Sequence, residues 1–138
     1  MLFKNIADSA SQLALRIQSE NLAHLDLMYI SPDAKEFADL VSQNLHQKDS
    51  LLLNIEHLAL STEHLVIVDD GSTPSNEFDE FTVRLRKLYP QVKTVLAIPI
   101  IPEAEVKNLE ICCDSLIYLS AEPLFFSLKQ FYSDTPLI

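Results

Sequence analysis

The segment from Val66 to Gly71 constrains the fold of this chain more than any other part of its sequence. Three β-branched apolar residues are followed by Asp69, Asp70 and the only glycine among 138 residues. Such a run is typical of a buried strand that leaves its sheet through a tight turn. In α/β proteins, the turns at the carboxyl ends of the strands carry the groups that face a ligand. The segment therefore predicts an α/β fold with a candidate site at this turn.

Helical and strand patterns alternate along the whole chain. Apolar residues at helical spacing predict helices over 3–18, 32–45, 77–89 and 102–109, and a terminal helix from Pro123. Continuous apolar runs predict strands over 25–30, 50–55, 65–70, 94–99 and 115–119. Buried strands separated by helices favour a parallel sheet that is covered on both faces. We predict a single domain over 1–138, a three-layer α/β sandwich with a five-stranded, mostly parallel sheet.

Charge and hydropathy narrow the classes of partner. The net charge is −10 at pH 7, whereas nucleic acids and anionic membranes attract clusters of Lys and Arg. No apolar run approaches the roughly 20 residues that span a bilayer. Residues 1–8 include polar and acidic side chains where a secretory signal is apolar. We therefore expect a cytoplasmic protein that binds neither nucleic acid nor membrane.

The strand with its paired acids and glycine resembles the ribose-phosphate motif of the type I phosphoribosyltransferases. The similarity continues through 81–86 into 95–99 and through 110–119. Residues 122–126 with 130–132 resemble the C-terminal helix of one bacterial branch, and the opening helix at 3–14 is similar to that of the same branch. The resemblance implies a phosphoribosyltransferase-like fold. It also implies the family's reaction, in which ribose is transferred from 5-phosphoribosyl 1-pyrophosphate to a base with the help of Mg²⁺. By the same resemblance, Asp69 and Asp70 contact the ribose hydroxyls.

Three of the four elements that hold the substrate in this family are missing from the sequence. The expected Thr-Gly-x-Thr loop is replaced by residues 72–77, in which Pro74 has no N–H and Glu77 would repel a phosphate at the start of a helix. The glycine loop after the first strand is replaced by residues 31–34, which contain an acid and no glycine. About half a dozen residues, 59–64, are too few for a lid. The sequence thus predicts a degenerate site.

Two interpretations of the turn remain open. Asp69 and Asp70 either form the polar end of a buried strand or hold Mg²⁺ or ribose hydroxyls. The residues after them either offer donors to a weakly bound polar ligand or form a turn with a helix cap at Ser75 or Asn76. The residues in question are Gly71, Ser72, Thr73, Ser75 and Asn76. We assign no catalytic residue.

The other chemistry-bearing residues form no recognisable site. The histidines at 24, 46, 57 and 64 lack a metal-binding spacing. Glu56, His57 and Glu63 are either a small acid–base group or polar residues on a solvated connection. Adjacent Cys112 and Cys113 are expected as small residues where a helix meets a strand, and coordination of a soft metal is the alternative. We expect no metal and no cofactor, and Mg²⁺ only if the protein is active.

Aromatic residues near the C-terminus predict self-association. Phe125, Phe126, Phe131 and Tyr132 form two adjacent pairs, so one member of each pair is expected to be exposed on the terminal helix. We therefore expect a homodimer. The leading hypothesis is a catalytically degenerate phosphoribosyltransferase-like domain that acts as a binding or protein-interaction module. The alternative is a residual phosphoribosyltransferase.

Overall fold

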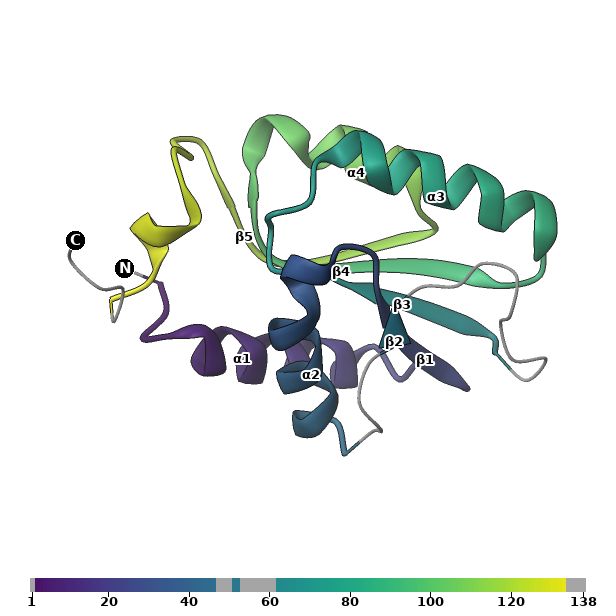
Figure 1. The fold of residues 1–138 in the computed structure, drawn as a ribbon, viewed down its shortest axis with the longest axis horizontal. Coiled ribbons are helices and arrows are strands. Elements are labelled where there is room, and N and C mark those ends of the chain that lie inside the picture. Colours follow the sequence, from purple (N-terminus) through teal and green to yellow (C-terminus); the bar gives the residue numbers. More distant parts are fainter. Residues whose placement is uncertain (1, 47–50, 53–61, 134–138) are drawn as a thin grey trace.

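The computed structural model describes residues 2–46, 51–52 and 62–133. A parallel sheet lies between two helical layers (Figure 1). One face of the sheet is covered by α1 (Ile6–Ser19) and α2 (Lys35–Asn44), and the other by α3 (Ser75–Leu88) and α4 (Val106–Cys112). The prediction of an α/β sandwich with a parallel sheet between helices is confirmed.

The sheet contains β1 (Leu25–Tyr29), β3 (His64–Val68), β4 (Lys93–Pro102) and β5 (Ser115–Glu122), with β2 (Leu51–Leu52) paired to β1. The order is β2-β1-β3-β4-β5, and every neighbouring pair is parallel. The remainder of the strand predicted over 50–55 lies outside the described residues. In the sheet, β2 lies on one side of β1 and β3 lies on the other side, so the direction in which strands are added reverses between β2 and β3. The crevice at the carboxyl ends of β1 and β3 is therefore the topological switch point, where ligands bind in such sheets.

Strand β4 continues to Pro102, beyond its predicted end at 99. The neighbouring strand β3 ends at Val68, after which the Asp69 amide donates to the Ala97 carbonyl at 3.0 Å. The backbone groups of Ala97 and Pro99 face the same edge of β4, the edge next to β3. Ala97 pairs with Val68, the last residue of β3, so Pro99 lies beyond the end of that strand. Because no β3 residue lies opposite Pro99, its missing amide hydrogen removes no hydrogen bond from the sheet. Strands β4 and β5 therefore remain paired beyond the end of β3.

The core occupies both faces of the sheet because successive strand residues point to opposite sides. Val66 and Val68 pack under α1 and α2, and Leu65 and Ile67 pack under α3 and α4. The predicted apolar stripe of the first helix is buried at Ala10, Leu13, Ala14 and Ile17, whereas Ile6 is 44% exposed. None of the described helices is long and apolar enough to cross a membrane.

The terminal helix predicted from Pro123 is wrong. Strand β5 continues to Glu122, and the chain then forms a loop that ends in the short 3₁₀ turn η4 (Leu128–Phe131). The Gln130 side chain closes this loop, since its Oε1 accepts from the Phe126 and Ser127 amides and its Nε2 donates to the Leu124 carbonyl. These bonds satisfy the backbone without a helix. The following residues pair with the N-terminal segment through Phe3 and Tyr132, so both ends of the described chain meet (Figure 1).

The helix predicted over 102–109 is displaced along the chain. Pro102 ends β4, and the 3₁₀ turn η3 (Glu103–Glu105) precedes α4. The shift follows from the extension of β4, because its last residues pair with β5 through Ile101 and Ala121 instead of starting a helix.

Candidate functional site

The side chain of Asp69 holds the turn after β3 together. It is 1% exposed. Its Oδ2 accepts from the amides of Gly71 at 2.8 Å and Thr73 at 3.2 Å, and its Oδ1 accepts from the Thr73 hydroxyl at 2.6 Å. Burial raises the pKa of the Asp69 carboxyl, and the Thr73 hydroxyl opposes that rise. Both carboxylate oxygens are therefore engaged inside the protein.

Asp70 has a different environment from its neighbour. It is half-buried, and its Oδ1 accepts from the Ser72 amide at 2.9 Å and the Ser72 hydroxyl at 2.6 Å. Its Oδ2 accepts no hydrogen bond from the described residues. Asp70 lines a cavity on the α1 and α2 face of the molecule. Of the two acids, Asp70 is the one that can reach a ligand.

Most backbone amides of the loop are used inside the loop itself. The amides of residues 71–73 donate to the two loop carboxylates. Pro74 has no amide hydrogen, and the Glu77 amide donates to the Pro74 carbonyl at 3.1 Å. Among the described residues 71–77, only the amides of Ser75 and Asn76 have no hydrogen-bond acceptor within the protein. A ligand phosphate would therefore meet two backbone donors.

Gly71 allows the tight path of this loop. Its φ is +106°, a conformation that L side chains rarely adopt. A Cβ at this position would lie 2.9 Å from Leu128 Cδ2 and 3.2 Å from the Ile100 carbonyl oxygen. The loop is thus pressed against both β4 and η4.

Helix α3 begins without a side-chain cap. Pro74 is its N-cap residue, and no side chain hydrogen bonds to the first turn from that position. The predicted cap at Ser75 or Asn76 is wrong, since these are the first two helical residues. Pro74 replaces the cap because its φ of −61° and ψ of 143° lead the chain directly into the helix. Glu77 follows in the first turn, where a carboxylate stabilises the positive end of the helix.

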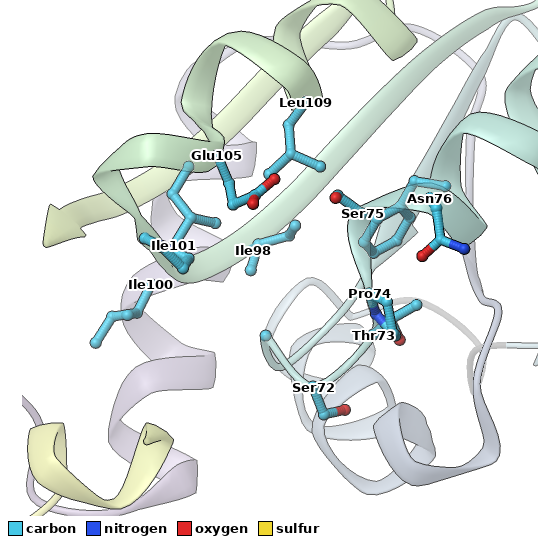
Figure 2. A pocket seen from close by; sticks show the side chains of 13 residues that line it. Ser72, Thr73, Pro74, Ser75, Asn76, Ile98, Ile100, Ile101, Glu105 and Leu109 are labelled. Atoms are coloured by element: carbon cyan, nitrogen blue, oxygen red, sulfur yellow. The ribbon is translucent and has the colours of Figure 1, made fainter. Parts of the chain in front are cut away.

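A cavity of about 310 Å³ lies between this loop, β4 and η3. Figure 2 shows the Glu105 carboxylate and the Ser75 hydroxyl facing one another across this space. The apolar wall comes from Ile98 and Ile101 of β4 and Leu109 of α4. A carboxylate on the wall opposite the start of α3 disfavours an anion there.

The other residues singled out from the sequence do not converge on this loop. Glu56 and His57 lie outside the described residues, and Glu63 is exposed. The His64 Nδ1 lies 2.7 Å from the Ala23 carbonyl oxygen. This ring therefore contacts the chain just before β1, at the amino ends of β1 and β3. Among the described residues, no group of three or more His, Cys, Asp or Glu side chains could hold a metal ion.

Cys112 and Cys113 are buried where α4 ends and β5 begins. Their thiols donate to the Leu109 carbonyl at 3.2 and 3.1 Å. The neighbouring Cys112 thiol raises the pKa of Cys113, and burial adds to the rise. Two buried cysteines at this place match the expectation of small residues at a helix–strand junction.

The aromatic residues are only partly exposed. Phe126 is 85% exposed, whereas Phe131 is 6% exposed and its ring lies 5.2 Å from that of Phe125. The Tyr132 ring lies 5.4 Å from that of Phe3, and its hydroxyl hydrogen bonds to Ser9 Oγ at 3.0 Å. The first pair therefore has one exposed member, as expected, and in the second pair neither ring is exposed.

Comparisons with known proteins show the fold. No protein-family model matches the sequence, and no curated protein matches it significantly. The chain is similar to the crystal structure of TT1426 from Thermus thermophilus, with a TM-score of 0.68 and 15% sequence identity. The similarity covers 99% of this chain and 93% of that one. Two chains that share so little sequence share an architecture, and an architecture does not determine an activity.

Proposed function

We propose that this chain is a phosphoribosyltransferase-like domain that has lost phosphoribosyl transfer and acts as a binding module. The observation that carries the proposal is that the backbone amides of residues 71–73 donate their hydrogen bonds to the Asp69 and Asp70 carboxylates. In a loop that holds phosphate, such amides point at the ligand. Here they stabilise the loop itself, and too few donors remain to hold a phosphate or to stabilise a pyrophosphate leaving group.

The turn after β1 supports the same proposal. Pro32 has no amide hydrogen, the Asp33 amide donates to Ser31 Oγ at 3.3 Å, and the Ala34 amide donates to the Ser31 carbonyl at 2.9 Å. The turn therefore uses its own amides, as the loop after β3 does. A pyrophosphate at the switch point would also meet the Asp33 and Asp70 carboxylates without a backbone cradle.

The alternative, a residual phosphoribosyltransferase, is favoured by one observation. Asp70 Oδ2 accepts no hydrogen bond from the described residues, and it lies beside the switch point. A carboxylate oxygen at this place suits a ribose hydroxyl or Mg²⁺.

Calorimetric titration of phosphoribosyl pyrophosphate with Mg²⁺ separates the two functions. We expect no heat at millimolar ligand for the natural protein. Micromolar binding that is lost in Asp70→Asn but retained in Glu80→Gln, which removes an exposed charge from α3, would establish the residual transferase instead. Asp69 is left unchanged because its removal would disturb the turn rather than test the ligand.

The interaction part of the proposal rests on the loop between β5 and η4. Leu124 and Phe126 are 68% and 85% exposed on this short loop. Large apolar side chains exposed together are enriched at protein interfaces. We propose that this loop contributes to a homodimer interface.

A further inference from the structure

We infer that a second cavity, between α1, α2 and η4, binds a small molecule with an apolar body and a protonated amine. This inference rests on the proposed binding function and names a ligand class for it. The cavity has a volume of about 620 Å³, twice that of the cavity before α3, and lies within the size range of small-molecule sites.

The position of the cavity agrees with the topology of the sheet. Glu36, Phe37 and Leu40 contribute from α2, which follows β1, and Asp70 contributes from the loop after β3. The cavity therefore lies beside the switch point between these two strands, where open α/β sheets bind ligands. The start of α1 and the turn η4 complete its walls through Ile6 and Leu128.

The walls of the cavity are largely apolar. Phe37 is 2% exposed and belongs to the core below α2. Ile6 is 44% exposed, although Ala10 and Leu13 further along the same helix are fully buried. Within the described chain, the first turn of α1 thus leaves apolar surface uncovered at the cavity. An apolar ligand body would bury this surface and be stabilised by it.

The charges around the cavity favour a cation. Asp70 Oδ2 has no donor among the described residues, and the Glu36 carboxylate is a second acid on the wall. Asp70 and Tyr132 both line the cavity. Burial raises the pKa of the Tyr132 phenol, and the negative charges of Asp70 and Asp8 add to the rise. Lys129 is the one cationic side chain among the described lining residues, and it is exposed on η4. An exposed lysine contributes little to binding an anion.

Three ligands with the same aromatic body test the inference: 2-phenylethylamine, 2-phenylethanol and 3-phenylpropanoate. Binding is measured by calorimetry or by ¹H–¹⁵N NMR titration. We expect the amine to bind most tightly. Because a hydrogen bond to a charged group contributes roughly 1.5–3 kcal/mol, Asp70→Asn should weaken amine binding about tenfold or more and leave the alcohol unchanged. Glu80→Gln, which removes an exposed charge from α3 on the other face of the sheet, should leave amine binding unchanged.

Ile6→Ser changes an exposed residue and tests the apolar wall. It should weaken all three ligands by similar factors, because it removes apolar contact and no charge. Absence of amine binding, a preference for the carboxylate, or an equal loss in Glu80→Gln and Asp70→Asn would overturn the inference. If the amine fails to bind and phosphoribosyl pyrophosphate gives no heat, the inference falls and the loss of transfer stands. If phosphoribosyl pyrophosphate binds, the proposed function falls whatever the amine does.

Discussion

The substitution Thr73→Val removes one hydroxyl from the buried turn after β3 and keeps the branched shape of the side chain. Thr73 is 9% exposed, and its hydroxyl donates to Asp69 Oδ1 at 2.6 Å. Within the described residues, no other donor reaches this oxygen. The variant therefore leaves one oxygen of a buried carboxylate without a hydrogen bond, and the rest of the turn retains its two amide donors to Oδ2.

The expected loss follows from the strength of such a bond. A hydrogen bond to a charged group contributes about 1.5–3 kcal/mol, so we expect the unfolding free energy to fall by about 2 kcal/mol at neutral pH. For a chain of 138 residues the entropy of unfolding is about 0.3 kcal/mol/K, and the Tm should fall by about 7 °C.

The loss should shrink as the pH falls. Burial raises the pKa of Asp69 in the folded protein, and removal of the Thr73 hydroxyl raises it further. A carboxyl whose folded pKa lies above its unfolded value makes the folded protein less stable as the pH rises between the two values. In the variant this window extends to higher pH. The difference between the two proteins is therefore complete above both folded pKa values and decreases as Asp69 becomes protonated.

Urea unfolding at neutral and at mildly acidic pH measures both effects. Thr82→Val is the matched control, because Thr82 is fully buried and its hydroxyl donates only to the neutral carbonyls of Phe78 and Asp79. We expect this control to lose less than about 1 kcal/mol, independently of pH. A loss in Thr73→Val that equals the control and does not change with pH would refute the reasoning about Asp69.

Two further variants test other parts of the molecule. Gly71→Ala forces a Cβ to within 2.9 Å of Leu128 at a φ of +106°, and strain of this kind costs about 1–3 kcal/mol. Urea unfolding that shows no measurable loss would contradict this account of the loop. Phe126→Ser removes an 85% exposed aromatic ring and should convert a dimer to a monomer in sedimentation equilibrium, whereas Leu15→Ser, 64% exposed on α1, should not. A natural protein that sediments as a monomer would rule out self-association through this loop.

The layers of the fold could be predicted because apolar spacing reports burial locally. The stripe at Ala10, Leu13 and Ile17 identifies the buried face of α1, and the run before Asp69 identifies β3. The end of β4 could not be predicted in this way. Pro99 is a reasonable strand end in the sequence, but its cost depends on where the neighbouring strand stops, and that is a property of the assembled sheet.

The candidate site also has one part that could be predicted from the sequence and one part that could not. The loop at 69–76 is contiguous, so its residues could be assigned together from the motif. The larger cavity could not, since Ile6, Glu36 and Lys129 are far apart in the sequence. They meet because β1 and β3 are neighbours and because the two ends of the described chain pair through Phe3 and Tyr132. Exposure of Ile6 in an otherwise buried stripe is the one local signal, and it becomes visible only once the helix is packed.

The paired acids show why a motif cannot by itself separate an active loop from a degenerate one. Asp69 and Asp70 are identical side chains on adjacent residues, yet Asp69 is enclosed by the turn and Asp70 keeps one oxygen at a cavity. The amides at 71–73 decide which role each acid has, since they donate to the acids instead of to a ligand. Releasing those amides for a phosphate would leave Oδ2 of the buried Asp69 carboxylate without a donor, a large cost for the folded state. A phosphate cradle therefore cannot be regained here by one substitution, because the same hydrogen bonds now stabilise the turn.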